Sequence, residues 1–417
     1  MLNDADSALL TQTGPGTPMG DVMRRYWLPT LLSTELSEPD SPPVRVKLLG
    51  ERLVAFRNTS GHVGMLEEFC PHRGVSLWLG RNEENGLRCV FHGWKFDIDG
   101  NCVDQMGERN PFKDKVHVVN YPAVELAGVV WTYMGPRELQ PPLPNFAWTQ
   151  VDEAYRHATK VVQECNWLQA LEGGIDTAHA PILHRALKPN STRGIPPNSE
   201  TVRGRAPDLE VDVTDYGYRY FGLYHQPDDS TFVRAYQYIM PFTQARPAEQ
   251  GILGNHGHFW VPMDDHECMV WNWVFSVSRE LTEEDRLEEG RGNGPSHVDQ
   301  TTFRSYANER NGWFINRDDQ KHETFTGIDG INTQDRATQE SMGVIVDRKR
   351  EHLGPADKAI IEARRLLFDA VKTVRDGGSP LGAGDSYYLA QAFQGKVPEG
   401  EDWREVIVPQ TIAAWAK

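Results

Sequence analysis

Four residues in two short motifs constrain this 417-residue chain more than any other feature. A Cys-x-His motif joins Cys70 to His72, and sixteen residues later a Cys-x-x-His motif joins Cys89 to His92. Thiolates and imidazoles bind structural zinc, but zinc sites usually leave two to four residues between the first two ligands. One intervening residue is tight for two ligands of a single tetrahedral ion. It is no obstacle if the cysteine and the histidine of each motif bind different metal atoms.

A [2Fe–2S] cluster of the Rieske type has this property, because one iron takes two cysteines and the other takes two histidines. The pattern therefore predicts that Cys70 and Cys89 bind one iron and that His72 and His92 bind the other. A zinc site is the alternative. The other three cysteines have no Cys or His at ligand spacing and are interpreted as unmetallated thiols: Cys102, Cys165 and Cys268.

The pattern of strands and helices predicts an α+β protein. Residues 44–135 alternate short apolar runs with turn residues, which is typical of a small all-β domain. Three prolines within residues 141–144 then indicate a domain boundary. Beyond it, strand-like runs in 208–275 and helical periodicity towards the end predict helices packed on an antiparallel sheet. Helices are expected at 17–32, 163–183, 333–350 and 356–375, and a polar surface excursion is expected at 280–300.

A second histidine pair forms another candidate metal site. His179 and His184 are five residues apart, so an ideal helix would turn them about 140° away from each other. Pro181 lies between them and predicts a kink that brings both imidazoles to one point. Two histidines and one carboxylate form the facial triad of non-haem Fe(II) oxygenases. The alternative is a helix with two ordinary hydrogen-bonded histidines.

The composition restricts the partners. With 59 Asp and Glu residues against 43 Lys and Arg, the net charge is −16, which argues against nucleic-acid binding and against an anionic membrane surface. No apolar run approaches the ~18–20 residues that span a bilayer, and the amino terminus lacks the pattern of a secretory signal. Five cysteines in a chain of this length do not predict a disulfide framework. We therefore expect a cytoplasmic protein.

Taken together, the two motifs resemble those of the Rieske non-haem iron oxygenases, specifically their α subunits, and within these the phthalate 4,5-dioxygenase group. The resemblance covers essentially the whole chain and includes the segments 14–20, 24–27, 166–184, 334–343 and 347–348. It implies an N-terminal helical segment packing on the catalytic domain (1–37), a Rieske domain (38–140), and a helix-grip catalytic domain with mononuclear iron (141–417). It also picks out Asp335 as the carboxylate ligand, with Glu340 and Asp347 on the same expected helix as alternatives.

The resemblance further implies a head-to-tail homotrimer, or stacked trimers. In that assembly Asp176 would join His92 of one subunit to His179 of the next, because a carboxylate that accepts from two imidazoles orients both rings. An NADH-dependent reductase with flavin and a ferredoxin-type centre would supply the electrons used to activate O2.

The expected substrate is an aromatic carboxylate. An arginine binds both oxygens of a carboxylate at once, and Arg234 resembles a substrate arginine of the phthalate group. Arg203 and Arg205 are weaker candidates. Ring hydroxylation and oxidative O-demethylation of a methoxylated lignin-derived acid both remain open. Two other classes also remain open: a Rieske electron-transfer protein without oxygenase activity, and a zinc-stabilised ligand-binding protein.

Overall fold

The computed structural model describes residues 2–191, 193–203, 207–248 and 254–413, and the chain divides into two units. One unit is Thr13–Pro144, and the other combines Met1–Gln12 with Asn145–Lys417. The segment 1–37, expected as one piece, is therefore shared between the units: residues 1–12 belong to the larger and 13–37 to the smaller.

The smaller unit contains three small antiparallel sheets. They are β1-β10-β9, β2-β3-β4 and β5-β6-β7-β8. The elements are α2 (Pro18–Met23), β1 (Trp27–Leu32), β2 (Val44–Leu48), β3 (Glu51–Arg57), β4 (Val63–Glu67), β5 (Arg81–Glu83), β6 (Gly86–Arg88), β7 (Trp94–Phe96), β8 (Cys102–Gln105), β9 (Ala123–Leu126) and β10 (Val129–Tyr133).

The helix expected at 17–32 is wrong beyond Met23. Residues 27–32 form β1 instead, an edge strand paired with β10. Pro29 gives the physical reason, because proline disrupts a helix interior but is tolerated on an edge strand. A fully buried apolar run has no periodicity that separates a helix from a strand.

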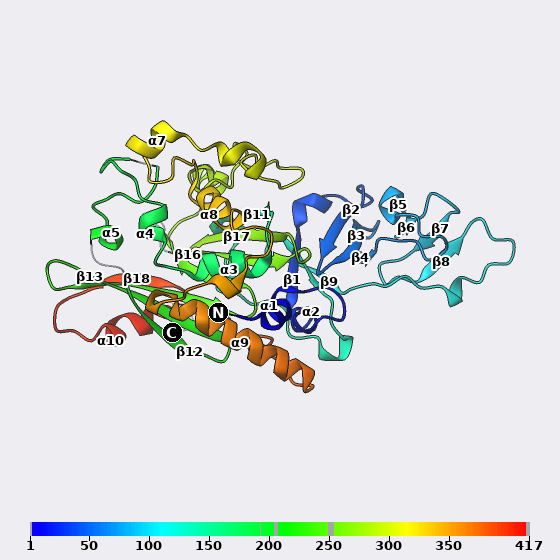
Figure 1. Cartoon of the computed structure of the whole chain (residues 1–417). Coiled ribbons are helices and arrows are strands. Elements are labelled where there is room, and N and C mark those ends of the chain that lie inside the picture. Colours follow the sequence, from blue (N-terminus) through cyan, green and yellow to red (C-terminus); the bar gives the residue numbers. More distant parts are fainter. Residues whose placement is uncertain (1, 192, 204–206, 249–253, 414–417) are drawn as a thin grey trace. The chain divides into compact units, whose positions relative to one another are not determined.

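The larger unit is built on one antiparallel sheet (Figure 1). The strand order is β11-β17-β16-β15-β14-β13-β12, with β18 paired to the first half of β14. Its strands are β11 (Arg156–Gln163), β12 (Asp208–Val213), β13 (Gly217–His225), β14 (Thr231–Ile239), β15 (Thr243–Pro247), β16 (Gly254–Pro262), β17 (Cys268–Ser276) and β18 (Phe393–Val397). Its α-helices are α1 (Asp4–Thr11), α3 (Trp167–Ile175), α4 (Ala180–Leu183), α5 (Glu200–Arg203), α6 (Glu283–Leu287), α7 (Arg317–His322), α8 (Ile331–Glu340), α9 (Lys358–Arg375) and α10 (Trp403–Ile407). The predicted α+β class is confirmed.

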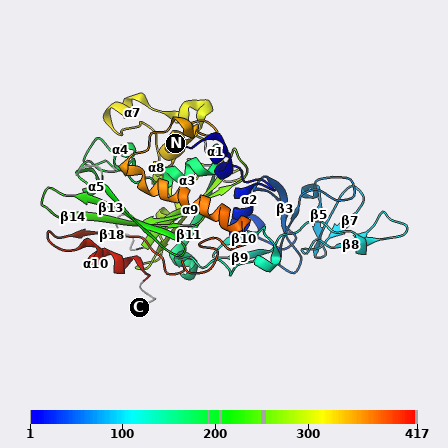
Figure 2. The ribbon, with the colours of Figure 1, turned by 60° about the horizontal axis from the view of Figure 1, so that its bottom comes forward.

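Helices cover both faces of this sheet. The long helix α9 lies across β12 and β13 (Figure 2), and the hydroxyl of Tyr218 donates to the carbonyl of Ala359 at 2.6 Å. On the other face, Phe221 and Leu223 form an apolar cluster with Ile407 of α10. Successive side chains of a strand point to opposite faces. The α9 face therefore carries the even-numbered residues of β13 and, through the cross-strand register, those of β14–β17.

The helix expected at 163–183 is interrupted earlier than Pro181. The helix α3 ends at Ile175, and residues 176–179 are non-helical. Pro181 occupies the first turn of α4, where its missing N–H costs nothing. Two glycines near the end of α3 allow close packing: a Cβ on Gly174 would lie 2.0 Å from the ring of Trp260 on β16.

Two further expectations are corrected. The helix expected at 333–350 ends at Glu340, and Gly343 then adopts a φ of +90°, which terminates helical geometry. The segment 280–300 is not wholly a surface excursion, because Glu288 and Asn293 are buried. Arg336 of α8 donates to the carbonyl of Gly292 at 2.7 Å.

Candidate active site: two metal-binding centres

The first candidate centre lies in two loops of the smaller unit that share one turn geometry. The amide of Gly74 donates to the carbonyl of Cys70 at 2.8 Å, and the amide of Gly93 donates to that of Cys89 at 3.0 Å. Both glycines have a positive φ, +73° and +75°, which a side chain would make costly. Each cysteine is thus at the start of a tight turn, with its histidine inside that turn.

The four predicted ligands lie in two close pairs, the two cysteines and the two histidines. Both thiols are buried, and burial, together with the neighbouring Cys89 thiol, raises the pKa of Cys70 to about 11. The rings of His72 and His92 have centroids 4.4 Å apart, and His72 stacks on Trp94 at 4.4 Å. The Nδ1 atom of His72 is buried without a hydrogen-bond partner among the described residues. A buried unpaired imidazole nitrogen is costly unless a metal binds it.

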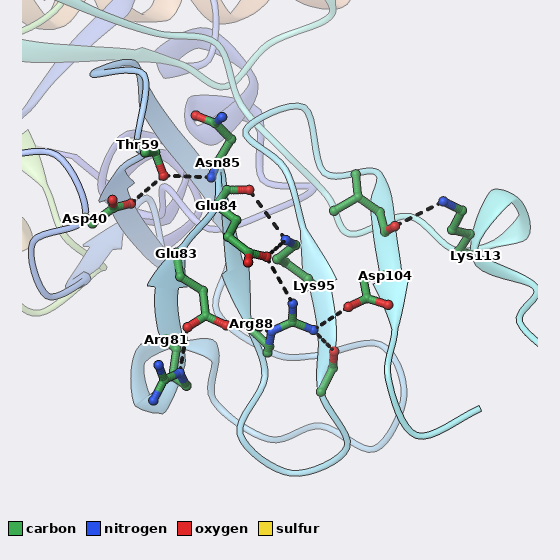
Figure 3. A network of polar contacts seen from close by, with 12 residues as sticks. Asp40, Thr59, Arg81, Glu83, Glu84, Asn85, Arg88, Lys95, Asp104 and Lys113 are labelled. Atoms are coloured by element: carbon green, nitrogen blue, oxygen red, sulfur yellow. Dashed lines mark hydrogen bonds and ion pairs between the residues drawn. The ribbon is translucent and has the colours of Figure 1, made fainter. Parts of the chain in front are cut away.

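A buried arginine anchors the second loop. Arg88 directly precedes Cys89 and donates to the carbonyl of Gly93 at 2.8 Å and to Asp104 at 2.6 Å. It also donates to Glu83 at 2.8 Å, so its guanidinium joins three segments of the β5–β8 sheet (Figure 3). This network fixes both ends of the loop that carries Cys89 and His92.

A buried carboxylate anchors the first loop. Glu68 is two residues before Cys70 and accepts from Ser76 at 2.5 Å and from Arg45 and Arg52 at 2.9 and 2.8 Å. Burial alone would raise the pKa of Glu68, but these three donors hold it below its ordinary value. The loop between Glu68 and Ser76 is therefore closed by a charge-assisted contact.

The second candidate centre lies in the larger unit, where His179, His184 and Asp335 meet. The Nε2 atoms of both histidines lie 3.3 Å from Oδ1 of Asp335. One ligand atom from each residue lies within 4.8 Å of the others. His179 and His184 flank the short helix α4, and Asp335 is on α8. His179 and His184 are the N-cap and C-cap of this one helical turn, so the two imidazoles meet at Asp335 without a backbone break between them.

The other ring nitrogens of these histidines are held by hydrogen bonds. Asp176 Oδ2 lies 3.3 Å from Nδ1 of His179, and Gln334 Oε1 lies 2.9 Å from Nδ1 of His184. Gln334 is itself fixed, because its amide donates to the carbonyl of Ile328 at 2.9 Å. Both rings therefore direct Nε2 towards Asp335. In metal sites, a carboxylate or carbonyl oxygen that accepts from the other ring nitrogen orients a ligating histidine in this way.

The electrostatics of the second centre favour a cation. Burial lowers the pKa of His179, but hydrogen bonds to Asp176 and Asp335 overcome it and raise that pKa to about 10. Burial would raise the pKa of Asp176, but the hydrogen bond from His179 keeps it below its ordinary value. The pKa of Asp335 is also well below its ordinary value, because both imidazoles offset its burial.

The two alternative carboxylates lie elsewhere. Glu340 accepts from the indole of Trp313 at 2.7 Å and from the amide of Glu164 at 3.1 Å. Asp347 lies beyond the end of α8, and its side chain accepts from the amide of Lys349 at 3.2 Å. Among the three acids considered, the structure places only Asp335 beside the two histidines.

A cavity adjoins the second centre. Residues from the sheet line it together with His179 and Asp335; they include Arg246, His258, Trp260 and Asn272. Arg246 and His258 were not among the residues predicted from the sequence, because no motif marks them. The sequence signal that could have found them is the alternation of side chains along β15 and β16, which places both residues on the α9 face.

The expected substrate arginine lies on the same face of the sheet. Arg234 is on β14 and shares that face with Tyr236, over whose ring its guanidinium lies at 5.4 Å. It is not among the residues lining the cavity beside Asp335. Arg203 is the last residue of α5 and its side chain is not described; Arg205 lies outside the described residues.

Comparisons with known proteins agree with this geometry. The family described as "Rieske [2Fe-2S] domain" matches residues 26–122, and the family "LigXa C-terminal domain like" matches residues 132–416. The chain is 36% identical to the phthalate 4,5-dioxygenase oxygenase subunit of Pseudomonas putida over 100% of this chain and 96% of that protein. It is 38% identical to the 3-chlorobenzoate-3,4-dioxygenase oxygenase subunit of Comamonas testosteroni, over 95% and 96%. The solved structure of Pseudomonas putida CBB5 NdmA QL mutant with theobromine has the same fold, with a TM-score of 0.61 and 19% identity over 92% of this chain and 99% of that one.

An all-β domain with two Cys–His loops and a sheet domain with a two-histidine, one-carboxylate centre define a Rieske-type oxygenase. The chain belongs to the Rieske non-haem iron oxygenases, among the oxygenase subunits related to phthalate 4,5-dioxygenase. It is therefore an oxidoreductase whose cofactors are a [2Fe–2S] cluster and a mononuclear non-haem iron. No helix in the part of the chain that the structure describes is long and apolar enough to cross a membrane.

The residues present fit both cofactors. Two buried thiols and two adjacent imidazoles, one with an unpaired buried Nδ1, match the mixed ligand set of a Rieske cluster. Two Nε2 atoms directed at one carboxylate oxygen match a facial triad for iron.

Proposed function

We propose that this protein is the terminal oxygenase of a multicomponent system that uses O2 and NADH-derived electrons to hydroxylate the ring of an aromatic carboxylate. The observation that carries the proposal is the cavity that His179 and Asp335 line together with the cationic Arg246. A carboxylate held by Arg246 would lie against the iron residues. The cavity has a volume of about 30 Å³, which admits a substituent but not a whole ring, so the proposal requires the cavity to widen when the substrate binds.

In this proposal, Cys70, His72, Cys89 and His92 hold the [2Fe–2S] cluster. His179, His184 and Asp335 would hold the mononuclear iron, and two of them, His179 and Asp335, line the cavity. When bound, the cluster supplies single electrons at a raised reduction potential and the iron activates dioxygen. The protein contributes geometry: Gln334 and Asp176 orient the two imidazoles, and Trp260 restricts water at the cavity wall.

Asp176 has a second proposed role as the link between subunits. Its contact with His179 is 3.3 Å, and one carboxylate has the capacity to accept from a second imidazole. In a head-to-tail homotrimer, or in stacked trimers, that second imidazole is His92 of the neighbouring subunit. The electron donor is an NADH-dependent reductase with flavin and a ferredoxin-type centre.

Two arginines are candidates for the substrate carboxylate. Arg246 lines the cavity, whereas Arg234 lies on the next strand of the same face. Both guanidinium charges act on His256. After burial and the charge of Arg291, they help to hold the pKa of His256 well below its ordinary value. We assign the direct contact to Arg246 and propose that Arg234 binds a more distant part of the substrate.

The test is a screen with a matched reductase. Phthalate, 3-chlorobenzoate, vanillate and benzamide would be compared for NADH oxidation that depends on the compound. Products from ring hydroxylation of a carboxylated substrate support the proposal. Formaldehyde from vanillate alone would identify the chain as an O-demethylase. Turnover of benzamide equal to that of the acids would refute recognition of a carboxylate.

A further inference from the structure

A row of polar side chains crosses the sheet and ends at the cavity. Thr159 of β11 is paired with Asn272 of β17, and Asn272 is paired with His258 of β16. Nδ1 of His258 lies 2.8 Å from Oδ1 of Asn272, Nδ2 of Asn272 donates to Oγ1 of Thr159 at 3.2 Å, and that hydroxyl donates to Oε2 of Glu288 at 2.9 Å. The row therefore runs from a buried carboxylate to a histidine that lines the cavity beside Asp335.

The carboxylate fixes the direction of every hydrogen bond in the row. The same Oε2 of Glu288 also accepts from the amide of Asn293 at 3.2 Å, so two donors point at one carboxylate oxygen. Thr159 has one hydroxyl proton and gives it to Glu288, so it must accept from Asn272. The NH2 group of Asn272 then faces Thr159, and its carbonyl faces His258. An amide orientation that is otherwise ambiguous is thereby determined.

The direction sets the tautomer of His258. A carbonyl oxygen only accepts, so Nδ1 of His258 must carry the proton. Burial, with the nearby positive charge of Arg246, holds the pKa of His258 well below its ordinary value, so the ring is neutral. A neutral imidazole with its proton on Nδ1 has a lone pair on Nε2. Asn272 is the hydrogen-bond partner of His258 among the described residues, and it occupies the Nδ1 edge.

A second histidine on the same strand face has the opposite arrangement. The guanidinium of Arg291 donates to Nδ1 of His256, so the proton of that neutral ring lies on Nε2. The two histidines lie two residues apart on β16, yet their partners give them different tautomers. The acceptor state of His258 thus arises from its own row and not from a general property of the face.

We propose that Nε2 of His258 accepts a hydrogen bond from a donor group on the ring substrate, a hydroxyl or an amine, and so selects aromatic acids that carry one. This proposal rests on the proposed function, because it names a second substituent of the same substrate. In this arrangement Arg246 binds the carboxylate of the substrate, and His258 accepts a hydrogen bond from its donor group. Thr159 and Glu288 are positioning residues that act through Asn272.

Ligand binding to the anaerobic holoenzyme tests the proposal. Titration calorimetry would compare 3- and 4-hydroxybenzoate with 3- and 4-fluorobenzoate, because fluorine is similar in size to hydroxyl but donates nothing. We expect one hydroxy isomer to bind about tenfold more tightly than its fluoro counterpart, the effect of one buried hydrogen bond. His258→Phe should remove that preference, and Thr159→Val should reduce it. His322→Phe, at an exposed position of α7, is the matched control and should keep it.

The outcomes separate this proposal from the proposed function. Equal binding of hydroxy and fluoro acids by the wild type, or a preference kept in His258→Phe, would overturn the role of His258. If none of the four acids binds, recognition of aromatic acids fails. The role of His258 is then decided by which of its ring nitrogens carries the proton. 15N spectra of histidine-labelled protein, assigned with His258→Phe, should show a proton on Nδ1 of His258. A proton on Nε2 would refute the proposal.

Discussion

Gln334 holds His184 in place for iron, and removing it should weaken iron binding. The Nδ1 proton of His184 is donated to Gln334 over 2.9 Å, and His184 is 4% exposed, so no water replaces the lost acceptor. In Gln334→Leu the imidazole keeps a buried, unpaired N–H, which costs about 1–3 kcal/mol. Loss of such an outer partner typically lowers metal affinity by about 10–100-fold.

The assay is the iron content of the protein after equilibration with graded chelator, together with its acid-labile sulfide. The iron-binding curve of Gln334→Leu should shift by about one to two decades while the sulfide content stays constant. Gln339→Leu is the matched control, because Gln339 is a buried glutamine of the same helix that accepts from Gln163 at 2.7 Å. Among the described residues it makes no hydrogen bond to either histidine. Iron affinity equal to that of the wild type, or an equal loss in Gln339→Leu, would refute the reasoning.

Three other substitutions test separate parts of the account. Cys70→Ser should abolish the visible absorption of the cluster, since a serine does not replace a thiolate ligand; retained absorption would contradict the ligand assignment. Asp176→Asn should leave both metals bound but slow single-turnover electron transfer, because a neutral amide oxygen is a weaker acceptor than the carboxylate for two imidazoles; an unchanged rate would remove its linking role. Arg246→Met should weaken binding of the carboxylated substrate by about 2–5 kcal/mol, as truncation of one partner of a buried charge pair does, and should affect the amide analogue much less. Equal losses for both ligands in calorimetry would make Arg246 structural.

The sequence was informative where ligands are close together along the chain. Cys70, His72, Cys89 and His92 lie within two loops, so their spacing limits the geometry whatever the rest of the chain does. Asp335 could be chosen only by resemblance, because 150 residues lie between it and His184 and many other acids occur in the chain.

The cavity could not be predicted in the same way. Arg246 and His258 come from neighbouring strands, and only the register of β15 with β16 places them on one face. The row that orients His258 needs the pairing of β11, β17 and β16, which no local pattern encodes. Likewise, the helix break before His179 arises where α3 ends at Ile175, whereas the sequence placed it at Pro181.

Metal analysis of Asp335→Ala tests the central claim most directly. The account predicts about three irons and about two labile sulfides per chain in the wild type, from one [2Fe–2S] cluster and one mononuclear iron. In the variant it predicts about two irons and an unchanged sulfide content, with the visible spectrum of the cluster retained. Zinc in place of iron in the wild type, or full iron content in Asp335→Ala, would contradict the assignment of this site.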